Sequence, residues 1–173
     1  MNYEDKGLLG WKGKMLIEYV IETLQPQLNK LVISANQHHD QYQQFNYPVI
    51  SDQIENFQGP LAGIYSAMQF CSEADYLLVL PCDCPTPPDD LFARLSDALS
   101  LSENKNIAIV DDGQRTQPLF GLYKTSLLPV LGTALQKNHN KVMQFISDNA
   151  TVSVNYSDQA NAFRNFNRPE DMQ

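Results

Sequence analysis

The sequence predicts an α/β protein of three layers, in which helices cover both faces of a mostly parallel sheet. One observation is the apolar run Tyr-Leu-Leu-Val-Leu at residues 76–80, which Pro81 ends. A short continuous run of this kind is typical of a strand buried on both faces. A second observation is that amphipathic helical segments alternate with short apolar strands through the first half of the chain. Because 173 residues with 43% hydrophobic content fit one domain with a sizeable core, we expect a single domain over residues 1–173.

The first half of the chain is expected to form helices and short strands in alternation. Residues 15–28 carry Leu, Tyr, Val and Ile at helical spacing, so they predict an amphipathic helix with Pro26 in its last turn. The next elements are a short buried strand, a polar surface helix, a strand that ends at Asp52, and a helix: residues 31–34, 37–45, 48–51 and 61–70.

The second half begins, after the strand at residues 76–80, with a helix that follows Pro87 and Pro88. Asp89 and Asp90 would lie in its first turn, where the helix dipole favours negative charge. The remaining elements are expected in the order strand, strand, helix, helix, strand: residues 107–110, 118–123, 127–136, 142–146 and 152–156.

The composition and charge balance exclude some classes of function. A formal net charge of -8 provides no basic surplus to neutralise a nucleic-acid backbone. No apolar stretch approaches the roughly 20 residues of a membrane span, and the first residues lack a signal-peptide pattern. Three cysteines without a disulfide framework favour a reducing compartment. We therefore expect a cytoplasmic protein that binds neither nucleic acid nor membrane.

Asp83 is the first candidate for chemistry, because the apolar strand leads directly to it. Ligands of parallel α/β sheets bind just past the carboxyl ends of the strands, and a carboxylate there suits Mg²⁺ that carries a nucleotide phosphate. The alternative is an aspartate that only shapes a turn before Pro85. Cys82 and Cys84 flank Asp83, but the sequence offers no second Cys or His pair to complete a zinc site. We therefore interpret both thiols as small side chains in a tight turn.

The segment Gly59-Pro-Leu-Ala-Gly63 leads into the helix at residues 61–70. Gly59 permits unusual backbone angles, and Gly63 permits close approach to the first helical turn, whose free N–H groups can hold an anion. The alternative is a tight loop followed by a helix whose glycine packs against a strand, and the pentapeptide alone favours it.

Two other groups give weaker signals. Lys6, Lys12 and Lys14 precede the first helix and could meet phosphate, although solvated lysines are the commoner case. Asp112, in the Asp-Asp-Gly turn after the strand at residues 107–110, could approach Asp83 if their strands are neighbours.

An ordered series of short motifs runs along the whole chain: Asp5-Lys-Gly, Gly13-Lys-Met, Ser34-Ala-Asn36, Asp52, Gly59-Pro-Leu-Ala-Gly63, Leu80-Pro-Cys-Asp83, Asp112-Gly-Gln-Arg115, Pro118 and Asn165-Phe-Asn-Arg-Pro169. This series resembles the molybdenum cofactor guanylyltransferase (MobA) family. The resemblance implies a Rossmann-like sheet of the nucleotide-diphospho-sugar transferase type. It also implies a reaction in which, with Mg²⁺, GMP passes from GTP to Mo-molybdopterin, pyrophosphate leaves, and Mo-molybdopterin guanine dinucleotide forms.

The resemblance also implies roles for single residues. Asp83 would bind nucleotide and Mg²⁺ and would share catalysis with Asn167, and Lys6 would contact the nucleotide phosphates. The nucleotide site would further include four residues: Asn36, Asp52, Gly59 and Gly63. Substrate binding would fall to Asn165 and Arg115. Besides GTP and Mo-molybdopterin, the implied partners are an accessory GTP-binding protein and molybdoenzyme chaperones.

The chain departs from the family at its start. The family opens with a strand and a glycine-rich loop, L-A-G-G-x-x-x-R-M-G, that wraps the triphosphate, whereas here Met1 stands four residues before Asp5. We therefore expect the first strand to be missing, its neighbours to expose unpaired backbone and apolar surface, and the chain to be unstable or weakly active. Three alternatives stay open: a related nucleotidyltransferase that uses CTP, one that makes a nucleotide sugar, or a non-catalytic nucleotide-binding fragment.

Overall fold

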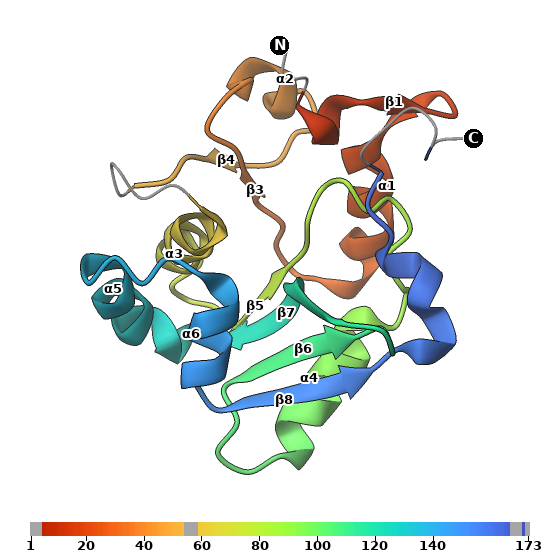
Figure 1. Ribbon diagram of the computed structural model, residues 1–173. Coiled ribbons are helices and arrows are strands. Elements are labelled where there is room, and N and C mark those ends of the chain that lie inside the picture. Colours follow the sequence, from red (N-terminus) through yellow and green to blue (C-terminus); the bar gives the residue numbers. More distant parts are fainter. Residues whose placement is uncertain (1–4, 54–58, 167–170, 172–173) are drawn as a thin grey trace.

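A computed structural model describes residues 5–53, 59–166 and 171, and its main sheet has four strands. They are β5 (Tyr76–Val79), β6 (Ile107–Asp111), β7 (Thr116–Lys124) and β8 (Thr151–Asn155), in the spatial order β5-β7-β6-β8 (Figure 1). β7 pairs antiparallel with β5 and β6, whereas β8 is parallel to β6. Three strands therefore share one direction and β7 opposes them, which confirms the α/β class with a mixed sheet.

The other strands form two small pairs. β3 (Ile33–Ser34) and β4 (Val49–Ile50) pair in parallel, and β1 (Gly10–Trp11) and β2 (Lys14–Met15) pair antiparallel. The β1–β2 hairpin is absent from the sequence prediction. Its two turn residues, Lys12 and Gly13, have φ angles of 45° and 90°, as a two-residue hairpin turn requires, but lysine is not the usual first residue of such a turn.

Helices enclose the main sheet on both faces. The described α-helices are α1 (Leu16–Leu24), α2 (His39–Gln43), α3 (Pro60–Phe70), α4 (Leu91–Leu101), α5 (Leu128–Gln136) and α6 (Val142–Asp148). The described 3-10 helices are Lys6–Leu8, Gln25–Gln27, Thr125–Leu127 and Ser157–Phe163. In β6, Ile107 and Ile109 join the core under α3, α5 and α6 (Figure 1). Ala108 and Val110 join the core under α4. This alternation within one buried strand produces the three predicted layers.

A third core lies around the β3–β4 pair. It joins α1, α2 and β3 through four buried side chains: Ile17, Ile21, Ile33 and Tyr42. The sequence predicts a polar surface helix over residues 37–45, whereas the observed α2 is shorter and buries Tyr42. One aromatic side chain therefore anchors an otherwise polar segment.

Two helix boundaries differ from the prediction for a reason that the sequence or the structure shows. α1 ends at Leu24, and a 3-10 helix that contains Pro26 follows, because proline lacks the N–H group that would continue the α-helical hydrogen bonds. α4 begins at Leu91, so Asp89 and Asp90 precede the helix instead of lying in its first turn. The other predicted helices and strands are present with shifted ends.

β5 is less buried than the sequence predicts. Leu77 is buried, but Tyr76 is 37% exposed, and Leu78 and Val79 are half-buried. Within the described residues β5 pairs with β7 alone, and its other edge borders a cavity. The exposure arises because no strand of the described ranges covers this edge.

A buried aspartate closes the turn between β6 and β7. Asp112 accepts hydrogen bonds from the backbone N–H groups of Gln114 and Arg115, both at 2.8 Å, and from Gln117 Nε2 at 2.6 Å. Burial favours the neutral carboxyl group, but the hydrogen bonds outweigh burial and lower the pKa of Asp112 below its ordinary value. The turn is therefore built around a charged acceptor.

Asp112→Asn should lower the free energy of unfolding at neutral pH by about 1–3 kcal/mol, because an amide replaces a charged acceptor that faces three donors. A carboxyl group with a lowered folded-state pKa stabilises the fold above its unfolded pKa, and this stabilisation disappears as the pH falls through the folded-state pKa. The difference between wild type and variant should therefore shrink below about pH 4. Urea unfolding across this range measures it. Asp97→Asn, at an exposed position of α4, is the matched control, and equal losses in both variants would refute the role of the turn.

Candidate active site

Three predicted site residues meet beyond the end of β5: Asp83, Lys6 and Asn165. The side chain of Asp83 is buried, because the residue is only 6% exposed. Lys6 Nζ lies 3.2 Å from Asp83 Oδ2, and Asn165 Nδ2 lies 3.4 Å from the same oxygen. A buried carboxylate needs such partners, because the loss of hydration destabilises an isolated charge. The three residues come from the beginning, the middle and the end of the described chain.

The N-terminal turn determines where Lys6 lies. Asp5 caps this turn: its Oδ1 accepts hydrogen bonds from Gly7 N at 3.3 Å and from Tyr42 Oη at 2.6 Å. Gly7 packs so closely that an added Cβ would lie 2.6 Å from Tyr42 Oη and 3.0 Å from Cys82 Sγ. Lys6 is therefore fixed between α2 and the segment that carries the site carboxylate. Sequence reasoning gave Tyr42 and Gly7 no role, although the Asp5-Lys-Gly motif was an available signal.

A segment near the C-terminus, Asn165 and Phe166, also packs against Asp83. Phe166 N donates a hydrogen bond to the Asp83 backbone carbonyl at 2.8 Å, and Cys84 Sγ donates one to Asn165 Oδ1 at 3.1 Å. The rings of Phe166 and Trp11 meet edge to face, with their centroids 5.0 Å apart. This segment therefore connects the site with the β1–β2 hairpin.

The two cysteines beside Asp83 are held as thiols. Burial, followed by the neighbouring Asp83 charge, raises the pKa of Cys82 to about 11. The same two causes raise the pKa of Cys84. Because thiolates are the nucleophiles and metal ligands, the protonated thiols serve here as packing groups and, for Cys84, as a hydrogen-bond donor. Within the described ranges, no three His, Cys, Asp or Glu side chains cluster so that they could hold a metal ion.

A second group of predicted residues lies just past the ends of β3 and β4. Asn36 Nδ2 donates to Asp52 Oδ2 at 2.8 Å, and Asp52 N donates to Asn36 Oδ1 at 2.9 Å. A Cβ added to Gly63, near the start of α3, would lie 3.1 Å from Ser34 Oγ and 3.4 Å from Asp52 Oδ1. Gly59 precedes α3 with a φ of 143°, an angle that favours glycine. Gly63 therefore makes a close approach, and its neighbours are the side chains of β3 and of Asp52.

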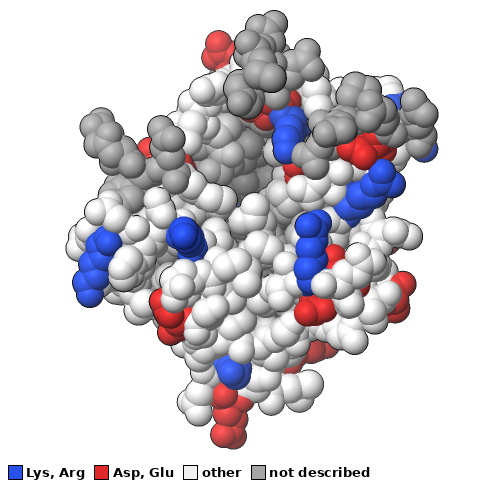
Figure 2. All heavy atoms as spheres, in the orientation of Figure 1, with Lys and Arg blue, Asp and Glu red and all other residues white. Residues whose placement is uncertain are grey.

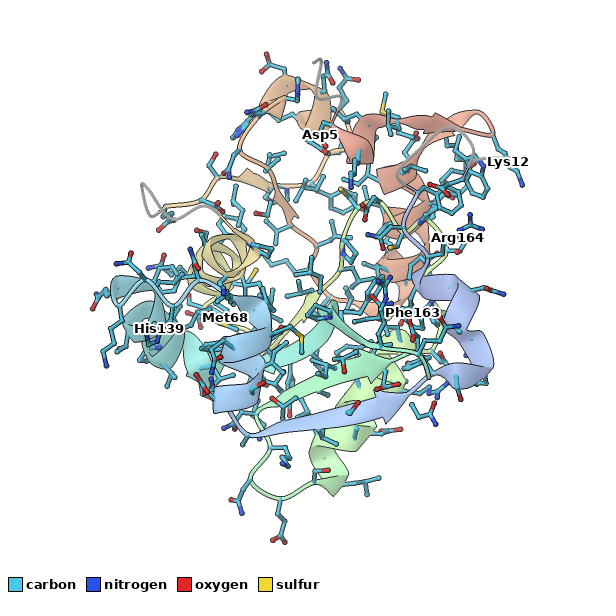
Figure 3. The ribbon with its side chains drawn as sticks, in the orientation of Figure 1. Asp5, Lys12, Met68, His139, Phe163 and Arg164 are labelled. Atoms are coloured by element: carbon cyan, nitrogen blue, oxygen red, sulfur yellow. The ribbon has the colours of Figure 1, made fainter. Side chains whose placement is uncertain are left out.

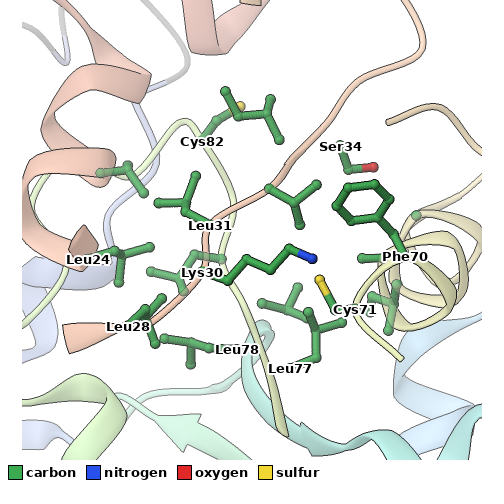
Figure 4. A pocket seen from close by; sticks show the side chains of 18 of the residues that line it. Leu24, Leu28, Lys30, Leu31, Ser34, Phe70, Cys71, Leu77, Leu78 and Cys82 are labelled. Atoms are coloured by element: carbon green, nitrogen blue, oxygen red, sulfur yellow. The ribbon is translucent and has the colours of Figure 1, made fainter. Parts of the chain in front are cut away.

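A cavity of about 830 Å³ borders the second group and reaches Cys82, the neighbour of Asp83 (Figure 4). Its polar end is lined by Asn36, Asp52, Gly59, Gly63 and Cys82. Its remaining wall is mainly apolar and comes from α1, α3 and the segments that contain β3 and β5. Carboxylate and amide groups thus gather where the strands end, which is where α/β sheets bind their ligands.

The other predicted residues are not joined to this site by the described contacts. The guanidinium of Arg115 is exposed, and its Nε lies 4.0 Å from Asp112 Oδ2. The strand that leads to Asp112 is not a neighbour of β5, because β7 lies between them. His139, which follows α5 and was no site candidate, lies across the molecule from Phe163, the last residue of the 3-10 helix Ser157–Phe163 (Figure 3). Asn167 lies outside the described residues, so its role remains a prediction.

Charged side chains are dispersed on the face shown in Figure 2, where basic residues stand apart and alternate with acidic ones. Lys14 Nζ pairs with Glu22 Oε1 at 2.6 Å, and Lys12 Nζ lies 4.6 Å from the centroid of the Trp11 ring. Of the three lysines that precede α1, the described contacts bring Lys6 to the site.

Comparison with known proteins identifies the family. A family model, the MobA-like NTP transferase domain, matches residues 1–154. The chain belongs to the MobA-like NTP transferase family. The molybdenum cofactor guanylyltransferase of Shewanella halifaxensis is 40% identical over 100% of this chain and 86% of its own length. That of Pasteurella multocida is 38% identical over 98% of this chain and 88% of its own length.

Solved structures agree on the fold. The crystal structure of molybdopterin-guanine dinucleotide biosynthesis protein A from Archaeoglobus fulgidus has a TM-score of 0.80 at 20% identity and covers 98% of this chain and 88% of that chain. That of 4-diphosphocytidyl-2C-methyl-D-erythritolsynthase from Anaerococcus prevotii has a TM-score of 0.68 at 11% identity and covers 97% and 88%. The MobA-like resemblance and the nucleotidyltransferase class expected from the sequence are thus confirmed.

Gly7→Ala should lower the free energy of unfolding by about 1–3 kcal/mol, because the new methyl group overpacks against Tyr42 and Cys82. Gly10→Ala is the matched control, since an added Cβ there meets nothing within 4 Å. Urea unfolding of both variants measures the difference. If Gly7→Ala were as stable as Gly10→Ala, the N-terminal turn would not be packed against the Asp83 segment as described.

Proposed function

We propose that this chain transfers GMP from GTP to Mo-molybdopterin, releases pyrophosphate and forms Mo-molybdopterin guanine dinucleotide. The observation that carries the proposal is the buried Asp83 carboxylate, held by Lys6 and Asn165 beyond the end of β5. Family membership supports it, because curated relatives at 38–40% identity are named molybdenum cofactor guanylyltransferase.

The reaction needs charge neutralisation and alignment more than a protein nucleophile. An oxygen of the terminal phosphate of the pterin attacks the α-phosphorus of GTP, the bond to the β-phosphate breaks, and pyrophosphate carries away the electron pair. Lys6 is proposed to offset the charge on the triphosphate and on the leaving pyrophosphate. The raised pKa of Cys82 agrees with a mechanism in which neither thiol attacks the substrate.

Asp83 is the proposed ligand of Mg²⁺. Mg²⁺ keeps several waters and is bound by one or two carboxylates together with substrate phosphates, so a single carboxylate at the site fits this ion. Asp83 Oδ2 is shared by Lys6 and Asn165, whereas Oδ1 meets only the weak thiol donor of Cys84, at 3.9 Å, among the described side chains. Bound Mg²⁺ would supply positive charge to the phosphates. Asn167 is the proposed second contributor to catalysis.

The nucleotide is proposed to bind at the polar end of the cavity, through Asn36, Asp52, Gly59 and Gly63. The mutual hydrogen bonds of Asn36 and Asp52 support this role, because they orient both side chains before a ligand arrives. Asn165 and Arg115 are the proposed contacts of the pterin substrate, and the exposed guanidinium of Arg115 is open to a phosphate.

The proposal also includes protein partners of this chain and its location in the cell. An accessory GTP-binding protein and molybdoenzyme chaperones are proposed partners, by the family resemblance. The cytoplasm is the proposed location, which the three free cysteines support. No helix among the described residues is long and apolar enough to cross a membrane.

Asp83→Asn should reduce pyrophosphate release from GTP, with Mg²⁺ and Mo-molybdopterin, by about 10²-fold or more, because the site loses its buried negative charge. Asp89→Asn, at an exposed position before α4, is the control and should keep full activity. The same assay with CTP tests base choice. Full activity of Asp83→Asn would overturn the assigned role, and preference for CTP would favour the related nucleotidyltransferase.

Lys6→Ala should reduce the same activity by about 10²-fold, because one preorganised cation leaves the phosphate site. Lys12→Ala, in the β1–β2 turn, is the control, since Lys12 lies over the Trp11 ring. Thermal unfolding should show both variants folded. A rate unchanged by Lys6→Ala would mean that Lys6 serves only to neutralise Asp83.

A further inference from the structure

One buried hydroxyl group links α2 to the turn that carries Lys6. Tyr42 is 3% exposed, and its ring belongs to the core around the β3–β4 pair. At the end of this ring, Tyr42 Oη donates a hydrogen bond to Asp5 Oδ1 at 2.6 Å. Figure 3 shows Asp5 beside α2. Phenylalanine would fill the same core, so the hydroxyl group needs a reason beyond packing.

The hydrogen bond between Tyr42 and Asp5 is of a strong type. An O–H donor that lies about 2.5–2.7 Å from a carboxylate oxygen forms a charge-assisted bond, about twice as strong as a bond between neutral groups. Burial, followed by the hydrogen bond to Asp5, raises the pKa of Tyr42 above its ordinary value, so the phenol stays a donor. The contact therefore holds Asp5 firmly against α2.

Asp5 passes this restraint to Lys6. Its Oδ1 also accepts a hydrogen bond from Gly7 N at 3.3 Å and thereby caps the turn Lys6–Leu8. The turn holds the backbone of Lys6, and Asp83 Oδ2 lies 3.2 Å from its Nζ. The Lys6 side chain is 49% exposed, so a ligand can still reach it. Because lysine has a flexible four-carbon stem, the position of its backbone decides which points Nζ can reach.

α2 also reaches the other half of the site. His39 Nε2 lies 2.9 Å from Ser51 Oγ, and Ser51 directly precedes Asp52, a proposed nucleotide contact. His39 and Tyr42 belong to one helix of five residues. α2 therefore contacts the strand end that carries Asp52 and the turn that carries Lys6, and it constrains one relative to the other.

We propose that Tyr42 is a positioning residue, which aligns Lys6 with the phosphates of the nucleotide during transfer. This inference rests on the proposed function, which assigns Lys6 to the triphosphate and the leaving pyrophosphate. Because Tyr42 is buried, it acts through Asp5 and the turn Lys6–Leu8. A cation that is already in place stabilises the charge developing on a leaving group best. Loss of the hydroxyl group should therefore slow transfer more than it weakens GTP binding.

Tyr42→Phe removes the hydroxyl group and keeps the ring. With GTP, Mg²⁺ and Mo-molybdopterin, its kcat for pyrophosphate release should fall about tenfold, while the KM for GTP changes less than about twofold. Tyr123→Phe is the matched control and should keep the wild-type kcat. Tyr123 is buried in the core under α3, α5 and α6, and its Oη donates to the Pro118 carbonyl at 3.3 Å. Thermal unfolding should show both variants folded.

A double-mutant cycle separates positioning from a general loss of stability. If Tyr42 acts through Lys6, Tyr42→Phe should not lower kcat further in a Lys6→Ala background. The same fold loss in both backgrounds would overturn the proposal, and so would a wild-type kcat in Tyr42→Phe. If Tyr42→Phe fails to fold, Asp5→Asn takes its place in the cycle, because a neutral amide is a weaker acceptor than a carboxylate.

Acetylation by acetic anhydride, read by mass spectrometry, tests the position of Lys6 without turnover. The ion pair with Asp83 should slow acetylation of Lys6, so Tyr42→Phe should raise the rate at Lys6 about threefold. Lys137, exposed after α5, is the internal reference and should react at the same rate in both proteins. If the wild-type chain releases no pyrophosphate, the proposed function fails and acetylation decides on positioning. A faster rate at Lys6 would support it, and an unchanged rate would overturn it.

Discussion

The structure depends on the burial of one negative charge. Asp83 is 6% exposed, and a carboxylate at that depth requires a cation and donors around it. Lys6 and Asn165 meet this requirement from positions 77 and 82 residues away. Their approach brings the N-terminal turn and the C-terminal segment to the chain beyond β5. A buried ion pair of this kind is weak evidence for stability, so its natural explanation is a ligand that uses the charge.

Much of the fold follows from periodicity, and the departures have physical causes. The apolar run of β6 and the apolar face of α4 specify buried positions directly, because burial repeats with the period of each element. The position of β7, antiparallel between β5 and β6, could not be predicted from the sequences of these strands, because strand order is set by the packing of distant elements. α2 shows the same limit, because a single residue, Tyr42, reverses the polar character of its segment.

Part of the candidate site could likewise be predicted from local sequence, and part could not. The strand that leads to Asp83 predicts a ligand position from local sequence alone. The role of Lys6 needed the family resemblance, because local sequence favours a solvated lysine there. The roles of Gly7 and Tyr42 and the hydrogen bond of Cys84 were not predicted, because they consist of contacts with residues far along the chain. The two halves of the site stand on strands of different sheets, so strand pairing among the described elements does not set their separation.

The contact of Trp11 with Phe166 has a practical consequence. The chain contains one tryptophan, and its ring lies against the segment whose backbone is bonded to Asp83. Its emission therefore comes from a single place, where the β1–β2 hairpin meets Phe166. Any ligand or substitution that lifts Phe166 away exposes the indole to water. The molecule thus carries an intrinsic optical reporter for the packing of the β1–β2 hairpin against Phe166.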